Sequence, residues 1–398
     1  YGVTSEGVAV FLKEALLAIG IDPHTMPFSV KLTGGPDGDV AGNMIKILHR
    51  DYPKTVRVVG MADGTGCAED PNGLPLTELL RLFERGDPLG KIDKSQLSGT
   101  GVLTLADTPA GAALRNGMHN RVIADAFVPA GGRPATMHAG NWQQYLLEDG
   151  TPSSKCIVEG ANLFLTAEAR QALFDTCQLP IVKDSSANKC GVICSSMEIV
   201  ASMSLSDDEF LEMKDLYVSQ VIDRLRELAR LEAQLIFSEQ MADPSASVPS
   251  LCERVSYATL RASNALNGLL NQMEENQRRR LWPLVREQLP QCLFDQHASR
   301  LPKSLPWEYQ SAMISSGLAS RLVYREGLAF SEALSDAQLP GFALRYLQQE
   351  QVVRTLAKQV RDSGADYAPQ VESLLLRGGV RAAAQHAGMM AQNNGYNH

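Results

Sequence analysis

Apolar residues in the first half of the chain form short runs that alternate with stretches of helical period. The segment 4–19 places its apolar side chains on one helical face and is closed by Gly20, which predicts a helix. Short apolar runs bounded by turn residues follow within 28–43, 55–66, 124–130, 155–160 and 179–184. Strands that alternate with helices are typical of an α/β fold, with a mostly parallel sheet covered by helices on both faces.

The pattern changes near Leu205. From Ser206 onward the apolar spacing predicts an amphipathic helix of about eight turns. Ser206 followed by Glu209 is typical of a capping box at a helix start. Helical period continues around 252–275, 308–335 and 346–382. We therefore expect an α/β domain over 1–205 and an all-helical region over 206–398, whose last residues, GMMAQNNGYNH, lack periodicity and are expected to be disordered.

The apolar run that begins at Phe28 leads into a glycine cluster, and the run that begins at Thr55 ends at Asp63. Glycines let a backbone turn sharply and approach a pyrophosphate, a helix N-terminus offers unpaired N–H groups, and an acid about 20 residues further on accepts hydrogen bonds from ribose. The pattern predicts a Rossmann-like βαβ unit that binds a dinucleotide, and with it nicotinamide redox chemistry. The candidate cofactor residues in these two segments are Gly35, Pro36, Asp37, Gly38, Asp39, Val40, Asp63 and Gly64, and Gly42 is the last glycine of the loop.

A structural interpretation of the same residues stays open. The spacing of Gly35, Gly38 and Gly42 is longer than in the usual G-x-G-x-x-G pattern, and Asp37 and Asp39 place negative charge where a diphosphate would lie. The segment could be a glycine-rich turn between a strand and a helix, with either aspartate as the helix cap. Asp63 could likewise be a turn acid beside the following glycine.

Three segments follow later apolar runs, where ligands lie in such sheets. The segment 128–134 contains Ala130 and Gly131, whose backbone could pass close to a ring or a ribose. Asn162 directly follows a predicted strand, and Asn188 precedes a predicted helix that carries Ser195. These polar side chains could orient a carboxamide or a carboxylate, although turn and cap residues are the commonest use of such residue types.

Composition limits the classes of partner that we expect this chain to bind. The chain has 398 residues, 44% of them hydrophobic and 21% charged, with a net charge of -8. An acidic balance disfavours nucleic acid and anionic membranes as partners, and no run of apolar residues is long enough to predict a membrane span. Seven cysteines favour reduced thiols, so we expect a cytoplasmic protein.

A metal site is not expected. The seven histidines form no pattern with metal-ligand spacing. Cys190 and Cys194 lie four residues apart but have no second pair, so buried thiols are favoured over a metal site. The basic run 278–280 is interpreted as a solvated helix face.

An ordered set of motifs over about residues 1–200 resembles the nicotinamide-binding domain of the glutamate dehydrogenase superfamily. The motifs are VTSEGV, GGPDGDVAGN, VVGMADGTG with PNGL, FVPAGG, IVEGAN with LTAEA, and NKCGV with SSME. GGPDGDVAGN and EGANLFLTAEAR are similar to the large NAD-specific glutamate dehydrogenases in particular. The resemblance implies that Thr4 and Asn162 lie at the nicotinamide side, that Asn188 is the asparagine of the family's N-A-G-G-V motif, and that Ser195 faces the substrate carboxylate.

The implied activity is oxidative deamination of L-glutamate to 2-oxoglutarate and ammonium, with NAD as hydride acceptor. NAD is favoured over NADP because Asp63 would repel a 2′-phosphate and no arginine follows it. The family's catalytic lysine and aspartate lie in segments that no part of this chain resembles, so no catalytic residue is assigned. We expect a carboxyl-terminal portion of a larger, homo-oligomeric enzyme whose amino-terminal part is missing.

Two alternatives remain. The full enzyme could be another amino-acid dehydrogenase of the superfamily, acting on a branched or aromatic substrate that the missing part selects. The chain could instead be a non-catalytic nucleotide-sensing or assembly module, an idea motivated by Asp37 and Asp39.

Overall fold

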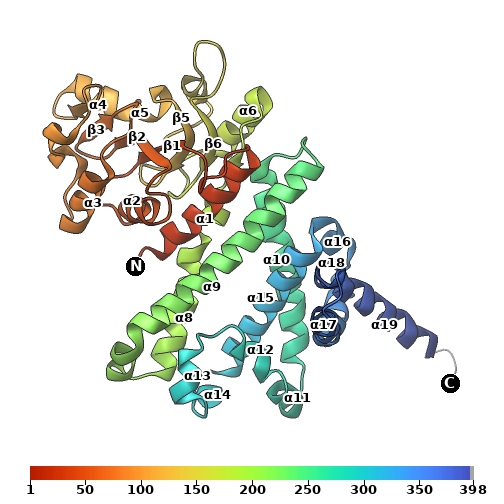
Figure 1. Cartoon of the computed structure of the whole chain (residues 1–398). Coiled ribbons are helices and arrows are strands. Elements are labelled where there is room, and N and C mark those ends of the chain that lie inside the picture. Colours follow the sequence, from red (N-terminus) through yellow and green to blue (C-terminus); the bar gives the residue numbers. More distant parts are fainter. Residues whose placement is uncertain (395–398) are drawn as a thin grey trace. The chain divides into compact units, whose positions relative to one another are not determined.

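The computed structural model describes residues 1–394, apart from the side chains of 377 and 388–394. The chain divides into two compact units, Tyr1–Glu253 and Arg254–His398 (Figure 1). The boundary expected after residue 205 lies inside the first unit, between α8 (Lys189–Ser204) and α9 (Asp207–Ala242). The division into domains at that residue stays a prediction.

The first unit is built on a seven-stranded sheet with strand order β4-β3-β2-β1-β5-β6-β7. Its strands are β1 (Phe28–Thr33), β2 (Val56–Ala62), β3 (Gly66–Glu69), β4 (Val102–Leu105), β5 (Ala124–Pro129), β6 (Ser154–Val158) and β7 (Ile181–Val182). The five strands from β2 to β7 in this order are parallel, and β3 pairs antiparallel with β2 on one side and with β4 on the other. The mostly parallel α/β fold is confirmed.

The point where the strand order reverses lies between β1 and β5. The chain passes from β1 to β2, β3 and β4 on one side and returns to β5 on the other side of β1. Such a reversal opens a crevice at the carboxyl ends of the strands, where ligands bind in this class of sheet. The loops adjoin closely there, because a Cβ on Gly34 would lie 3.0 Å from the Gly131 nitrogen.

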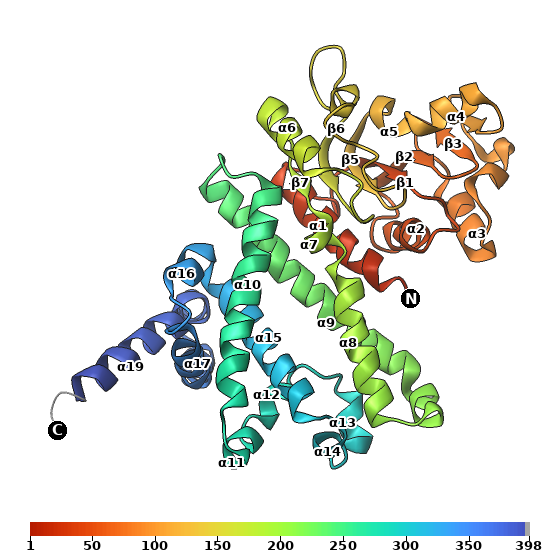
Figure 2. The same cartoon turned by 180° about the vertical axis from the view of Figure 1, so that it is seen from behind.

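Helices cover both faces of the sheet. The helices α1 (Val3–Ala18), α2 (Asp39–Asp51) and α3 (Leu76–Arg85) lie on one side, and α4 (Pro109–Asn116), α5 (Met118–Arg121) and α6 (Ala167–Cys177) lie on the other (Figures 1 and 2). The remaining short elements are η1 (Leu89–Lys91), η2 (Lys94–Gln96), η3 (Trp142–Tyr145) and α7 (Asp184–Ala187). After Asn141 the chain forms the 3₁₀ turn η3, and Leu146 then pairs with Pro152 in an isolated antiparallel bridge.

Helices alone follow β7 in the described residues. The capping box of Ser206 and Glu209 is present at the start of α9, which has 36 residues and is longer than predicted. The helix α10 (Val248–Asn271) begins in the first unit and continues into the second.

The second unit consists of helical elements, as predicted. These are α11 (Glu275–Arg279), α12 (Trp282–Arg286), α13 (Cys292–His297), α14 (Leu301–Ser304), α15 (Trp307–Glu326), α16 (Leu328–Ala333), α17 (Leu339–Asp362), α18 (Ala368–Leu374), the π-helical turn η4 (Leu375–Gly379) and α19 (Val380–Asn394). The tail that we expected to be disordered continues α19 as far as Asn394, and residues 395–398 lie outside the described part.

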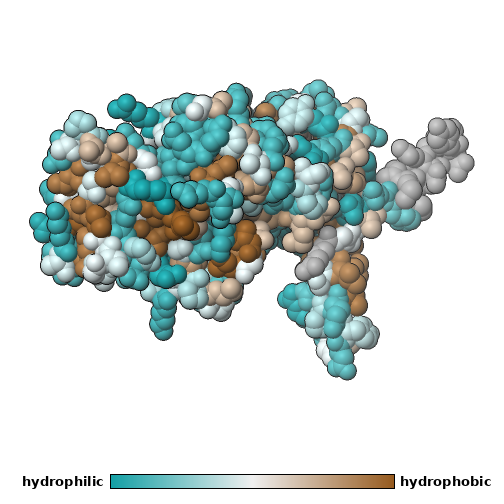
Figure 3. Space-filling view, turned by 90° about the horizontal axis from the view of Figure 1, so that it is seen from above, coloured by the Kyte–Doolittle hydropathy of each residue, from teal (hydrophilic) through white to brown (hydrophobic). Residues whose placement is uncertain are grey.

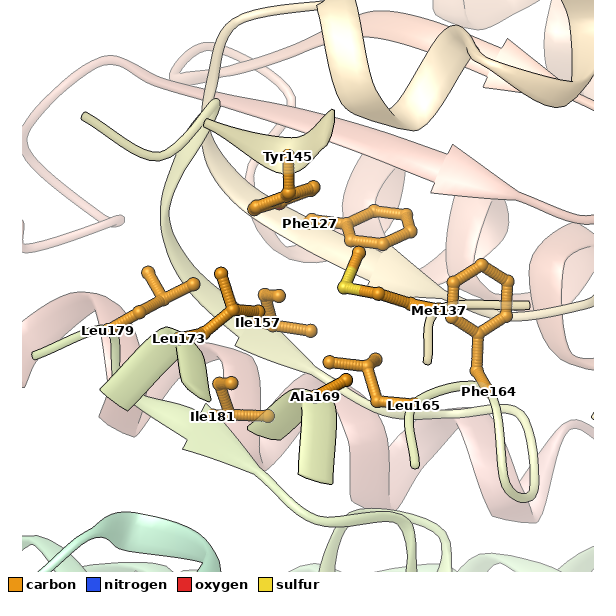
Figure 4. Close-up of a cluster of buried hydrophobic side chains, with 10 residues drawn as sticks. All are labelled: Phe127, Met137, Tyr145, Ile157, Phe164, Leu165, Ala169, Leu173, Leu179 and Ile181. Carbon is orange, nitrogen blue, oxygen red and sulfur yellow. The ribbon is translucent and has the colours of Figure 1, made fainter. Parts of the chain in front are cut away.

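A hydrophobic cluster supports the loops at the carboxyl edge of the sheet on the α6 side (Figure 4). Phe127 and Ile157 from the strands, Tyr145 from η3 and Leu173 from α6 belong to it. Phe164 and Leu165 also belong to it, and both come from the loop that follows β6. The buried side chains of Phe164 and Leu165 therefore hold this loop against the hydrophobic cluster.

A buried lysine lies in the same unit. Lys31 on β1 is fully buried, and its Nζ donates to the carbonyl oxygens of His119 and Val122, each at 2.7 Å. Nζ also donates to Ser153, at 2.6 Å to Oγ and 3.1 Å to the carbonyl oxygen. Burial lowers the pKa of Lys31 well below its usual value.

The face shown in Figure 3 carries hydrophilic side chains interrupted by several hydrophobic patches. Within residues 1–394, no helix is both long and apolar enough to span a bilayer. The same part of the chain holds no group of three or more metal-ligating side chains. The thiols of Cys190 and Cys194 are both buried, as expected for structural cysteines.

Candidate cofactor site

The glycine loop joins the end of β1 to the start of α2. Gly38 is the N-cap of α2, and its N–H donates to the Gly35 carbonyl at 3.0 Å, which closes the turn. Gly42 lies in the first turns of α2, where a Cβ would be 2.2 Å from the carbonyl oxygen of the buried Pro36 and 2.6 Å from the Phe83 ring. Only glycine allows α2 to approach the loop so closely, which is the packing role of the last glycine in a dinucleotide-binding loop.

The two aspartates of the loop are exposed at the N-terminus of α2. Asp39 lies in the first helical turn, where the helix dipole stabilises a negative charge, and its Oδ1 accepts from Asn43 at 3.2 Å. Because both carboxylates reach solvent, they can turn away from an anion that binds the backbone N–H groups. The negative charge is therefore compatible with a phosphate at this helix end, although it weakens the attraction between the helix end and the phosphate.

Asp63 lies directly beside the glycine loop. A Cβ on Gly35 would be 2.5 Å from Asp63 Oδ2. Oδ1 accepts from the N–H and the hydroxyl of Thr65, at 2.7 and 2.6 Å, and Oδ2 accepts from the Leu89 N–H at 2.7 Å. Asp63 therefore closes a turn, as the structural interpretation proposed, and its carboxylate also lies against the glycine loop. Gly64 is exposed, and a Cβ there would contact nothing within 4 Å.

A second group of candidates converges around Gly160, just after β6. Asn188 donates through Nδ2 to the Gly160 carbonyl at 3.2 Å and to Asn162 Oδ1 at 2.6 Å. A Cβ on Gly160 would lie 3.1 Å from Val40 Cγ1 in the first turn of α2. The two asparagines and the N-terminus of α2, far apart in the sequence, are thus brought together.

Helix α1 completes this group. The hydroxyl of Ser5 donates to the Val40 carbonyl at 2.9 Å, which fixes α1 against α2. Thr4 faces α8, because a Cβ on Gly191 would lie 2.6 Å from Thr4 Oγ1. Thr4, Val40, Asn162 and Asn188 therefore surround one corner of the carboxyl edge of the sheet, beside the point where the strand order reverses.

Ala130 and Gly131 lie at that reversal. The Ala130 N–H donates to the Thr33 carbonyl at 2.9 Å, and the Thr33 hydroxyl donates to the Gly131 carbonyl at 2.6 Å. Their backbone hydrogen bonds therefore join the end of β5 to the end of β1. The next glycine in this segment, Gly132, packs instead against the Phe164 ring, 2.7 Å from a Cβ placed on it.

Ser195 is not brought into the group around Gly160. It is exposed on α8, and its hydroxyl donates to the Gly191 carbonyl at 3.4 Å. It lies roughly 10 Å along the helix from Asn188, given the rise of an α-helix. Ser195 lies one helical turn beyond Gly191, the residue against which Thr4 packs.

The sequence alone did not indicate a buried ionic network behind these loops. Glu159 is completely buried and pairs with Arg170 on α6, with Nε to Oε2 at 2.7 Å and Nη2 to Oε1 at 3.1 Å. Arg170 Nη2 also lies 3.7 Å from Oδ1 of the buried Asp184. Burial raises the pKa of Glu159, and the Arg170 guanidinium opposes that shift. One signal was available, because Glu159 directly follows an apolar run and Asp184 lies two residues after one.

Comparison with known proteins decides the family. A family model described as Glutamate/Leucine/Phenylalanine/Valine dehydrogenase matches residues 1–239. The chain belongs to this family. The match extends past the region that carries the sequence motifs and reaches into α9.

Individual relatives agree with the family. The chain is 31% identical over 357 residues to a probable NAD-specific glutamate dehydrogenase of Schizosaccharomyces pombe, covering 82% of this chain and 30% of that protein. It is 30% identical over 366 residues to the NAD-specific glutamate dehydrogenase of Neurospora crassa, covering 83% and 33%. This chain therefore spans about a third of the length of the curated relatives it matches.

Among solved structures, a hetero-hexameric glutamate dehydrogenase from Thermus thermophilus aligns with 63% of this chain and 50% of its own, at 17% identity and a TM-score of 0.45.

Proposed function

We propose that this chain supplies the cofactor-binding part of an NAD-dependent dehydrogenase that oxidises L-glutamate to 2-oxoglutarate and ammonium. The observation that carries the proposal is the convergence of Val40, Asn162 and Asn188 around Gly160, next to the glycine loop, with Thr4 packed against Gly191 on α8. Family membership and the names of the relatives support the choice of NAD and of glutamate.

The residues present fit such a cofactor. The N–H groups at the start of α2 can bind the pyrophosphate. The close packing of Gly42 against Pro36 holds the loop against α2, so that the loop leaves room for the pyrophosphate. Asp63 Oδ2, which accepts one protein N–H, has acceptor capacity left for a ribose hydroxyl. Within the described residues, Asn162 Nδ2 makes no protein hydrogen bond, so it can donate to the carboxamide of a nicotinamide.

When bound, NAD would accept the hydride, and this chain would bind, orient and enclose it. The Asn162–Asn188 pair would fix the rotation of the nicotinamide ring relative to the substrate. Ser195, exposed on α8, would donate to a substrate carboxylate.

Acid–base chemistry is proposed to come from another part of a longer polypeptide. The charged residues near the asparagines are already paired. Lys189 binds Glu232, at 2.6 and 2.7 Å, and Asp184 accepts from the N–H groups of Leu163 and Ser185. Neither side chain is available to shuttle a proton to a 2-oxo group. We further propose that the complete enzyme is a cytoplasmic homo-oligomer.

The proposal is tested by calorimetric titration of the purified chain with NADH and with NADPH, together with a glutamate turnover assay. We expect NADH to bind, NADPH to bind more weakly, and no turnover by this chain alone. Absence of NADH binding would contradict the cofactor assignment, and turnover would contradict the assignment of acid–base catalysis to another part.

The substrate is tested on the full-length protein. We expect glutamate to be oxidised in preference to leucine, phenylalanine and valine, the other amino acids in the family's name. Preferential oxidation of any of these would retain the cofactor assignment and overturn the choice of glutamate.

A further inference from the structure

A single guanidinium lies behind the loops that carry both asparagines. Arg170 bridges Glu159, which directly follows β6, and Asp184, which begins α7 two residues after the end of β7. All three side chains are at most 8% exposed. Two buried carboxylates that share one cation are costly unless each is held by further hydrogen bonds.

The carboxylates find those hydrogen bonds in the loop after β6. Glu159 Oε1 accepts from the Leu165 N–H at 3.1 Å, and Asp184 Oδ2 accepts from the Leu163 N–H at 2.8 Å. The network therefore fixes the backbone directly after Asn162.

That backbone is strained. Leu163 has a φ of 58°, in the left-handed region that disfavours a residue with a Cβ. Its side chain is 59% exposed, so packing of that side chain does not offset the cost. The hydrogen bonds of the Leu163 N–H to Asp184 and of the Ala135 N–H to the Leu163 carbonyl, at 2.7 Å, hold this conformation.

The same network reaches Asn188. The Asn188 N–H donates to the Asp184 carbonyl at 3.0 Å, and its side chain donates to Asn162. Asp184 thus fixes the backbone next to both asparagines, because it accepts from the N–H groups of Leu163 and Asn188. Arg170 in turn holds the carboxylates of Asp184 and Glu159 in place.

We propose that Arg170 is a positioning residue for the nicotinamide half of the cofactor site: it holds Glu159 and Asp184 so that the strained turn at Leu163 aims the Asn162 amide at the nicotinamide. This inference rests on the proposed function. A lysine could not replace Arg170, because a single ammonium cannot make a bidentate pair with Glu159 and still reach Asp184.

The test compares NADH with ADP-ribose, which carries the same adenosine and diphosphate but no nicotinamide. In Arg170→Lys we expect NADH affinity to fall about tenfold while ADP-ribose affinity changes less than about twofold. The enhancement of bound NADH fluorescence should also decrease, because the nicotinamide is less well fixed. Arg230→Lys on the exposed face of α9 is the matched control and should leave both affinities unchanged.

A rescue variant separates positioning from general destabilisation. Glycine adopts a positive φ without a Cβ penalty, so Arg170→Lys combined with Leu163→Gly should regain most of the lost NADH affinity. If Arg170→Lys does not fold, Asp184→Asn, which keeps the side-chain shape but removes its charge, should show the same selective loss of NADH affinity and the same rescue.

Three outcomes overturn the inference in distinguishable ways. Equal losses for NADH and ADP-ribose would make Arg170 a structural residue of the whole unit. Unchanged NADH affinity would show that the network does not act on the nicotinamide. Failure of the unsubstituted chain to bind NADH would remove the proposed function itself, and the inference with it.

Discussion

Gly42→Ala tests the close approach that shapes the cofactor loop. A Cβ at this position would lie 2.2 Å from the Pro36 carbonyl oxygen and 2.6 Å from the Phe83 ring. Ordinary contacts of this kind are about 3.5 Å, so the oxygen is roughly 1 Å too close. Phe83 is partly exposed and can rotate, but the carbonyl belongs to a buried proline in the loop itself.

Two terms of opposite sign set the magnitude. Replacing glycine by alanine inside a helix favours folding by about 1 kcal/mol. Overpacking against buried backbone costs about 1–3 kcal/mol, and an overlap with a carbonyl that cannot rotate away places Gly42→Ala at the upper end. We therefore expect a net loss of about 1–2 kcal/mol in the free energy of unfolding. Because α2 must move away from Pro36, NADH affinity should fall as well.

A second glycine provides the control. Gly268 lies exposed in α10, and a Cβ there would contact nothing within 4 Å. Gly268→Ala keeps only the favourable term, so it should stabilise the protein by up to about 1 kcal/mol and leave NADH affinity unchanged. Urea unfolding followed by circular dichroism, with NADH titration of each variant, measures both effects. A Gly42→Ala protein as stable as the unsubstituted chain would refute the steric reasoning.

Three further predictions concern charge and polarity in the first unit. Asp63→Asn keeps the shape that accepts from Thr65 but removes the charge that repels a 2′-phosphate, so the ratio of NADPH to NADH affinity should rise about tenfold in calorimetric titration; an unchanged ratio would assign the preference to other groups. Asn162→Ala should weaken NADH but not ADP-ribose, and equal weakening would contradict a contact with the nicotinamide. The pKa of Lys31 is lowered by burial, so between that value and about 10.4 the folded chain binds fewer protons than the unfolded chain and stability rises with pH. Lys31→Met should remove this rise, lowering the slope by at most about 1.4 kcal/mol per pH unit in urea unfolding at several pH values, whereas the exposed-site control Lys54→Met should keep it.

The parallel core of the sheet could be predicted because its strands appear in the sequence as apolar runs between turn residues. β1, β2, β5 and β7 lie within such runs, and β6 begins one residue before its run. The antiparallel strands β3 and β4 could not be predicted in this way. Each has only four residues: β3 reads GCAE and has no β-branched side chain, and β4 reads VLTL but is not buried. They form because β2 offers an unpaired edge next to a tight turn at Asp63.

The candidate site was predictable in position and not in detail. The rule that ligands lie after the carboxyl ends of strands singled out Asn162 and Asn188, which the structure joins by a hydrogen bond of 2.6 Å. The partners of Asp63 could not be read from the sequence. Thr65 is close by in the chain, but Leu89 reaches the carboxylate only through the fold of the α3–η1 connection.

The buried network shows most clearly where sequence reasoning stops. An acid directly after a buried strand, such as Glu159, must find a cation or neutralise, because an isolated buried charge costs several kcal/mol. That argument predicts a partner without naming it, since the chain offers many arginines and lysines. The partner is decided by α6 crossing over both strand ends, which places Arg170 between Glu159 and Asp184. The strained Leu163 follows from this, because its left-handed conformation persists only while the surrounding hydrogen bonds hold it.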